Sequence, residues 1–203
     1  MKRIISTLLI AFGFTVAMNA QTAREARLNV LDVDRMAYNI EFNFEQKVVQ
    51  DGWNKKADEL KIKSKPQKGL DVFTAVLVPD IHFESIDIYV KIDRLDKARS
   101  TFTITVSKGN TNFISTDEGK LVSNLNTFLE KLIIYIEQYK LGLDIADQEK
   151  EISNTQKAYD KLIQDGKDLQ KKIDDNKVSQ ENKVKELEAL NKGLEELKLK
   201  VKK

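Results

Sequence analysis

The chain has 203 residues, with no cysteine, one histidine and 34 basic against 32 acidic side chains, a formal net charge of +2. This near balance argues against a nucleic-acid-binding protein, because such proteins present a basic face to the phosphate backbone. Without cysteine the chain can form neither stabilising disulfides nor a cysteine-linked lipid anchor, so packing must stabilise the fold.

The beginning of the chain has the three parts of a secretory signal peptide. Lys2 and Arg3 form the basic start, residues 4–16 form the apolar core, and small residues lead to a cleavage site after Ala20. Cleavage after Ala17 is the alternative. The apolar core is shorter than the about 20 residues that a transmembrane helix needs. We therefore expect an exported protein, periplasmic or surface-associated, without a transmembrane anchor after cleavage.

The first part of the mature chain has the patterns of a small α+β domain. Residues 35–44 alternate apolar and polar side chains as a half-buried strand does, and 46–61 place apolar residues at helical spacing. Another strand is predicted at 71–78 and a hairpin of two strands at 86–107. A helix with a wide apolar stripe follows over 121–136. This order (strand, helix, three strands, helix) predicts a four-stranded antiparallel sheet with both helices on one face.

Two local features mark where this domain ends. The sequence "STDE", Ser115–Glu118, is typical of a capping box at the start of the last helix of the domain. Near Ile145 the composition changes abruptly to lysine, acidic residues and amides. We therefore predict a signal peptide (1–20), a small α+β domain (21–143) and a charged helical tail (144–203).

A seven-residue repeat runs through the tail and predicts a coiled coil. Its centre is polar at Asn176, Gln180 and Lys183, which leaves two arrangements: a straight helix, or a helical hairpin that turns near Asp174–Lys177. We favour the straight helix, because the repeat keeps its register and no proline interrupts it. Ten of the fifteen first and fourth positions are apolar, and they form the predicted interaction stripe: Ile152, Tyr159, Leu162, Leu169, Ile173, Leu187, Leu190, Leu194, Leu197 and Val201.

The charges of the tail are mixed along its length, with 14 lysines and 14 acidic residues from Asp144 to Lys203. Such mixing is typical of the solvated exterior of a coiled coil. Anionic lipid or nucleic acid would call for a basic face instead. The expected partner is a second copy of the chain or another protein.

The sequence offers one weak candidate for chemistry. Asp80, His82 and Glu84 would share one side of an extended segment, where histidine and carboxylates can bind a divalent metal or transfer protons. However, His82 is the only histidine, and alternate polar residues are usual at an exposed strand edge. The sequence also contains no nucleophile elbow, phosphate loop or dinucleotide fingerprint. We expect no catalytic residue, metal or cofactor, and no enzyme activity.

Several segments resemble a family of exported Bacteroidetes proteins without an established activity: the "AYNIEF" strand, the following helix with Trp53, "VLVPDIHFESIDIYVKID" and the lysine- and glutamate-rich tail. The resemblance implies a small exported α+β domain with a coiled-coil extension. Family members often have a glycine-rich "DLGGAF"-like stretch where this chain has Val106–Ser115, so the resemblance assigns no function to that loop here.

Two functions fit these features. The first is a non-enzymatic structural or protein-interaction module of the cell envelope, whose tail mediates oligomerisation or spacing. The alternative is a small ligand-binding domain with an apolar pocket between the sheet and the helices.

Overall fold

The computed structural model describes residues 22–109 and 111–201, so the expected signal peptide lies outside the described residues. The chain divides into two compact units, of which the first ends at Gly142 and the second begins at Leu143. The strands and helix α1 (Gln46–Glu59) belong to the first unit. Helix α2 (Gly119–Val201) begins in the first unit and continues through the second.

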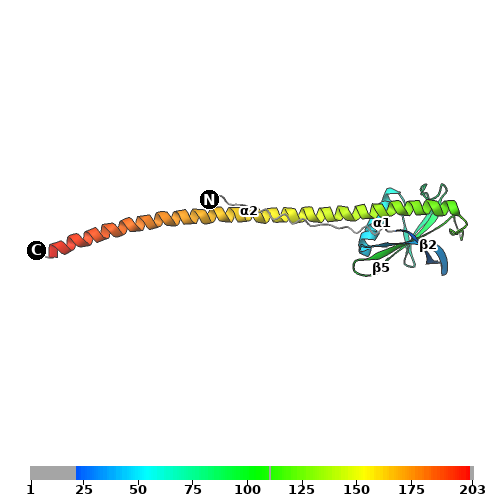
Figure 1. Cartoon of the computed structure of the whole chain (residues 1–203), viewed down its shortest axis with the longest axis horizontal. Coiled ribbons are helices and arrows are strands. Elements are labelled where there is room, and N and C mark those ends of the chain that lie inside the picture. The colour runs from blue at the N-terminus through cyan, green and yellow to red at the C-terminus, as the bar shows by residue number, and fades with distance from the viewer. Residues whose placement is uncertain (1–21, 110, 202–203) are drawn as a thin grey trace. The chain divides into compact units, whose positions relative to one another are not determined.

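The first unit is built on an antiparallel sheet that has six strands among the described residues. The prediction of an α+β fold is confirmed, but the prediction of four strands is wrong, because β1 and β3 were missed. Across the sheet the order is β1-β2-β6-β5-β4-β3; Figure 1 shows the sheet with β2 and β5 labelled. The bounds are β1 (Arg24–Val30), β2 (Val33–Phe42), β3 (Lys65–Gln67), β4 (Leu70–Val76), β5 (Ile86–Arg94) and β6 (Ser100–Ser107).

Strand β1 was missed because neither the strand nor its turn has a strong sequence signal. Leu31 and Asp32 join β1 to β2 with positive φ at both residues, 54° and 62°, as a type I′ turn requires. This turn usually contains Asn-Gly or Asp-Gly, and neither pair is present here. Within β1 only Leu28 and Val30 are buried, so the alternation is too short to identify.

Strand β3 is a short edge strand. Its three residues are all exposed, and Pro66 fits an edge because proline cannot donate a backbone hydrogen bond to a neighbouring strand. Lys68 and Gly69 form the turn to β4, again with positive φ. An exposed strand of this length leaves no hydrophobic pattern in the sequence.

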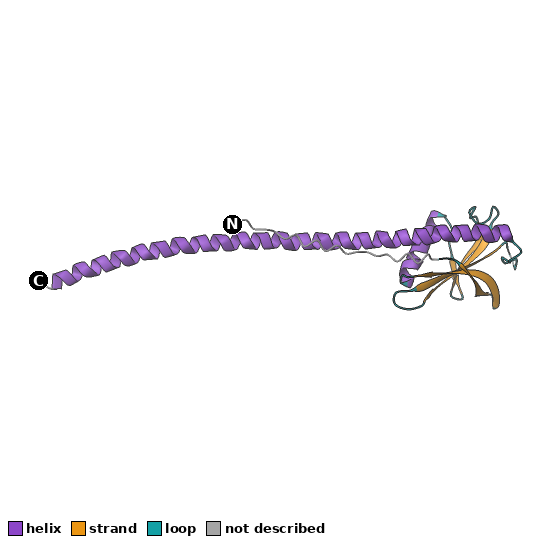
Figure 2. Cartoon of the chain, viewed as in Figure 1, coloured by secondary structure: helices purple, strands orange, loops and turns teal. Residues whose placement is uncertain are grey.

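Helix α1 and the first turns of α2 cover one face of the sheet (Figure 2). Trp53 of α1 is completely buried there, and its ring meets Phe73 and Phe102 edge-on at centroid distances of 5.5 and 5.2 Å. Gly52 lets the helices approach closely, because a Cβ at this position would lie 3.2 Å from Tyr139 Cδ1. The predicted apolar stripe of the second helix is buried as expected: Leu121, Leu125, Phe128, Leu129, Leu132, Ile133 and Ile136.

The opposite face of the sheet carries a second, smaller core. An ion pair of 2.9 Å between Asp32 and Lys68 joins the β1–β2 turn to the β3–β4 turn. The sheet therefore curls until its two outer hairpins meet. Seven buried residues lie in this second core: Leu28, Val30, Ala37, Leu70, Val72, Tyr89 and Phe113.

Helix α2 begins at Gly119, later than the predicted capping box requires. A capping box would place Ser115 just before the helix and the Glu118 carboxylate inside its first turn. Instead, Glu118 precedes the helix, and its carboxylate forms an ion pair with Lys108, the residue that follows β6. The carbonyl of Glu118 accepts the Val122 N–H at 3.0 Å, so the capping-box prediction is wrong.

Helix α2 runs without a break through the polar centre of the tail, so the straight helix is confirmed and the hairpin near Asp174–Lys177 does not form. Side chains four residues apart bond along this stretch: Gln180 Nε2 donates to Asn176 Oδ1 at 2.6 Å, and Gln170 Nε2 donates to Asp174 Oδ1 at 3.0 Å. Among the described residues, neither helix combines the length and the apolar character of a membrane span.

Candidate functional site

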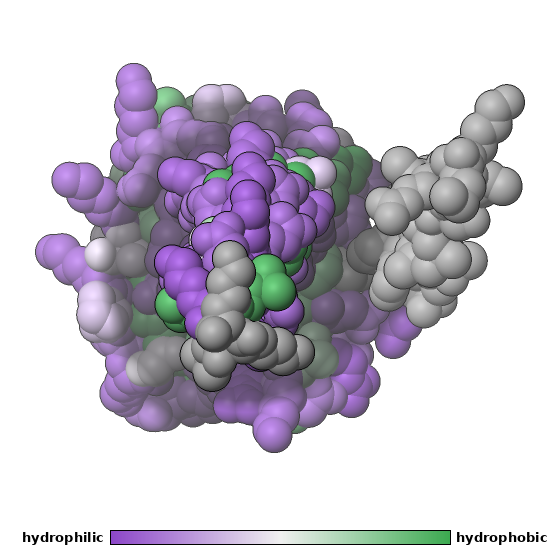
Figure 3. All heavy atoms as spheres, turned by 90° about the vertical axis from the view of Figure 1, so that its left-hand side faces the viewer, coloured by the Kyte–Doolittle hydropathy of each residue, from purple (hydrophilic) through white to green (hydrophobic). Residues whose placement is uncertain are grey.

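The predicted interaction stripe lies on the surface of the second unit. From residue 143 to residue 200 every residue is exposed except Gly193, which is half-buried. The stripe residues whose side chains are described are 50 to 69% exposed. Figure 3 shows hydrophobic residues among hydrophilic ones at the C-terminal end of α2, which faces the viewer. The side chain of Val201 lies outside the described residues. The described residues of the second unit therefore leave the apolar seam of their helix exposed.

Two further apolar residues widen this seam. Ile163 and Val184 each follow a fourth position of the repeat and are 44% and 53% exposed. Sequence reasoning missed them because it considered only first and fourth positions. Counting the flanking positions as well would have found them, since these also contact a partner helix in a coiled coil.

The polar centre of the seam does not interrupt the helix, because its side chains have partners along the same helix. Lys183 Nζ lies 2.6 Å from Glu186 Oε2, and Gln180 bonds to Asn176. Such neighbouring pairs stabilise a helix by only about 0.2–0.5 kcal/mol each. Fully burying one leucine or isoleucine contributes roughly 1.5–3 kcal/mol, so the apolar residues outweigh these pairs in any packed arrangement.

Asp80, His82 and Glu84, the three residues of the weak metal candidate, do not form a group that could hold a metal ion. Asp80 Oδ2 forms an ion pair with Lys131 Nζ of α2 at 3.1 Å. His82 Nδ1 accepts the backbone N–H of Glu84 at 3.0 Å, and its ring stacks on the exposed Phe83. Across the described residues no group of three or more histidine or acidic side chains could hold a metal ion. The segment is held in the first unit by the buried side chains of Val78 and Ile81. Asn124 Nδ2 of α2 donates to the Ile81 carbonyl at 3.1 Å.

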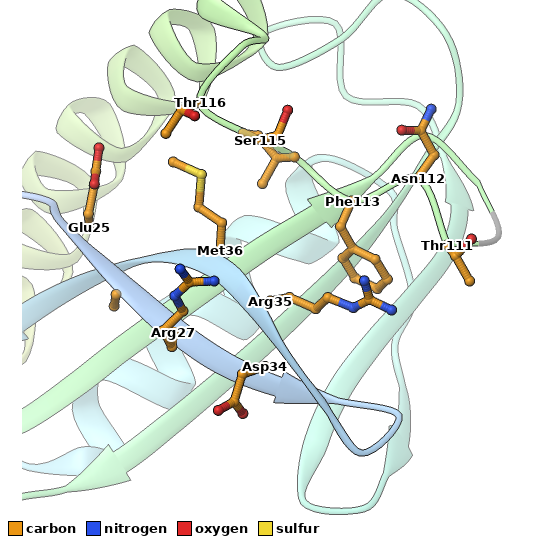
Figure 4. Close-up of a pocket in the computed structure, with 12 residues that line it drawn as sticks. Glu25, Arg27, Asp34, Arg35, Met36, Thr111, Asn112, Phe113, Ser115 and Thr116 are labelled. Atoms are coloured by element: carbon orange, nitrogen blue, oxygen red, sulfur yellow. The ribbon is translucent and has the colours of Figure 1, made fainter.

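A polar hollow of about 580 Å³ lies between the β1–β2 hairpin and the loop that follows β6 (Figure 4). The Arg35 guanidinium lies 4.6 Å from the centre of the Phe113 ring, and its Nε is buried without a hydrogen-bond partner in the described part of the chain. A guanidinium can bind a carboxylate or phosphate. Arg27, Glu25 and Asp34 also line the hollow, however, so charges of both signs face it. No sequence signal pointed to this hollow.

The apolar pocket of the alternative function would lie between the sheet and the helices. That space holds the main core, where Phe42, Trp53 and Phe102 have no exposed surface. The hollow of Figure 4 lies elsewhere, beside the second core, and its lining is mainly polar.

Comparison of the chain with protein-family models, with curated proteins and with solved structures found no match. The resemblance to exported Bacteroidetes proteins therefore stays a prediction. Function must be argued from the residues of this chain.

Proposed function

We propose that this chain is a non-enzymatic, exported structural or protein-interaction module of the cell envelope. Its first unit is a compact domain, and its tail helix packs against another helix to mediate oligomerisation or spacing. The observation that carries the proposal is the apolar stripe of the seven-residue repeat, which lies exposed on a helix that buries no side chain from residue 143 to residue 200.

A helix with an apolar stripe is stabilised mainly by packing of that stripe, because short-range helical interactions are weak. Gly166 and Gly193 lower the intrinsic stability of this helix by roughly 1 kcal/mol each relative to alanine. Contiguous apolar surface on a soluble protein also marks an interaction site. Both arguments support a partner helix on the stripe.

The mass of the protein in solution tests the proposal. Sedimentation equilibrium of residues 21–203 should give a mass above that of one chain, whereas a chain that ends at Gly142 should be monomeric. A monomer for both, with no bound partner after purification from the native envelope, would contradict it. Export is tested separately by the mass of the natural protein, which should begin at Gln21.

A matched pair of substitutions tests whether the stripe itself makes the contact. Leu190 and Leu199 are equally exposed, 63% and 67%, but they lie nine positions apart and so about 180° around the helix. Leu190→Lys should abolish association, because it places a charge in the seam. Leu199→Lys should leave the mass unchanged. Equal effects of the two substitutions would mean that the seam is not the contact.

A further inference from the structure

The charges and the seam of the tail together indicate which helix covers the stripe. We propose that it is the tail of a second copy of this chain, running antiparallel, with the pairing centred between Asp174 and Asp175. This inference rests on the proposed function, since it names the partner of the same stripe.

A parallel pairing in register is unfavourable at three places. Lys183 would face Lys183 of the second copy within the seam, and these two like charges would repel each other. Gly166 would face Gly166, and the seam there would lack side chains to fill it. Lys172 would flank Lys177 of the second copy, because flanking residues five positions apart meet across a parallel coiled coil.

An antiparallel pairing brings the first positions of one copy against the fourth positions of the other. With the proposed centre, Ile152 faces Leu197, Tyr159 faces Leu190 and Leu187 faces Leu162 of the second copy. Each of these layers occurs twice because of the two-fold symmetry. Most apolar residues at the two ends of the tail thus bury one another, although Leu194 faces Thr155. Near the centre, Leu169 faces Gln180 and Ile173 faces Asn176.

The same pairing places Lys183 opposite Gly166 of the second copy. The glycine leaves room for the long lysine side chain, because it has no side chain of its own in the seam. Asp165, beside Gly166, supplies an opposite charge nearby. Antiparallel pairing therefore accommodates the two residues that are least favourable in a parallel coiled coil.

The ends of the tail are oppositely charged. Asp147, Glu149 and Glu151 stand near its beginning with one lysine between them, whereas the last six residues of the sequence contain four lysines and no acid. An antiparallel pairing sets the acidic beginning against the basic end, and a parallel pairing sets the lysines together. Charges that flank a seam select the orientation of coiled coils.

The paired surface is large enough for a stable dimer. The seam and its two flanking positions supply about 30 residues from each copy, and specific protein interfaces use about 20–30. Because the chain has no cysteine, its orientation can be measured with single introduced thiols.

The test uses spin labels on residues 21–203 at two outward positions, Lys192→Cys and Val178→Cys, each measured by double electron–electron resonance. In the antiparallel dimer the labels at 192 lie about 50 Å apart along the axis, whereas those at 178 lie about 10 Å apart. In a parallel dimer neither pair is displaced along the axis. The label at 178 therefore serves as the internal control, and sedimentation verifies that both labelled proteins keep their mass.

The expected result is a clearly longer distance for 192 than for 178. Equal distances for the two labels in a dimer would overturn the antiparallel pairing and leave the proposed function standing. A monomeric mass with a native partner of different sequence would overturn only the second copy as partner. A monomeric mass without any partner would contradict the inference and the proposed function together.

Discussion

Trp53 is completely buried, yet its indole Nε1 has no hydrogen-bond partner among the described residues. The packing of its ring against Phe73 and Phe102 must outweigh this unmade bond, because a buried donor without a partner costs about 1–3 kcal/mol. The residue is thus a structural centre of the first unit and, as the only tryptophan, a fluorescent reporter of that unit.

Replacement of Trp53 should distinguish the stability that its ring packing contributes from the free-energy cost of its unpaired N–H. Trp53→Ala should lower the free energy of unfolding by about 3–5 kcal/mol. Trp53→Phe should cost clearly less, because it leaves a smaller cavity and removes the unpaired N–H. Urea unfolding followed by circular dichroism measures both. Equal losses for the two variants would mean that aromatic packing contributes little here.

Tyr135 links α2 to α1, since its hydroxyl donates to Glu59 Oε1 at 2.6 Å. Burial of the hydroxyl and this hydrogen bond raise the pKa of Tyr135 from 10 to about 12. Between these values the unfolded chain loses this proton and the folded protein keeps it. The stability that Tyr135 contributes is therefore present below pH 10 and is lost as the pH rises towards 12.

Alkaline unfolding should show this contribution. The difference in free energy of unfolding between the natural protein and Tyr135→Phe should shrink as the pH rises from 10 to 12. In a tyrosinate absorbance titration, Glu59→Gln should shift the last-titrating tyrosine to a lower pKa. An unchanged titration in Glu59→Gln would show that the hydrogen bond does not hold the proton.

At the scale of elements, the β1–β2 hairpin shows how a segment with few apolar residues can still be fixed. Leu28 and Val30 pack into the second core, and the Asp32–Lys68 ion pair connects exposed turns. Exposed ion pairs contribute only about 0–1 kcal/mol. The apolar contacts must therefore hold this hairpin against β4.

A paired substitution tests this assignment. Val30 and Val33 are cross-strand partners at the same turn, but Val30 is 1% exposed and Val33 is 46% exposed. Val30→Ala should lower the free energy of unfolding by roughly 1–3 kcal/mol, and Val33→Ala by less than about 0.5 kcal/mol. Chemical denaturation of both variants provides the comparison. Similar losses would argue that strand propensity, rather than the second core, fixes the hairpin.

At the scale of the whole molecule, the two units have different sources of stability. The first unit has its own core on both faces of the sheet. The second unit buries no side chain among residues 143–200, and under the proposed function a partner stabilises its helix. Stability that comes from association depends on protein concentration, whereas the stability of a single domain does not.

Thermal unfolding at two protein concentrations should therefore give two kinds of transition. The transition followed by Trp53 fluorescence reports the first unit and should keep its midpoint. The loss of tail helix, followed by far-UV circular dichroism, should move to higher temperature at higher concentration. A tail transition that does not depend on concentration would contradict pairing of the tail.

Particular residues explain how far the sequence alone could predict this molecule. The apolar stripe from Leu121 to Ile136 and the seven-residue repeat of the tail extend over many residues. Both segments could therefore be identified as helices from the sequence. β1 and β3 are short, and their pairing depends on positive φ at Leu31, Asp32 and Lys68. No residue type at these three positions requires that conformation, and the two strands were missed.

The candidate surfaces follow the same division. The apolar stripe could be read from the sequence because a helix places residues three and four apart on one side whatever surrounds it. The hollow brings together Arg35 of β2 and Phe113 of the loop after β6, which are 78 positions apart in the chain. Only the curled sheet creates that contact.

The sequence by itself determined the α+β class, the core stripe of α2 and the seven-residue repeat of the tail, because periodic patterns act locally and need no knowledge of distant neighbours. The tertiary structure decided the number of strands and the closure of the sheet through the second core. These features depend on contacts between distant segments and on backbone conformations that the residue types leave open.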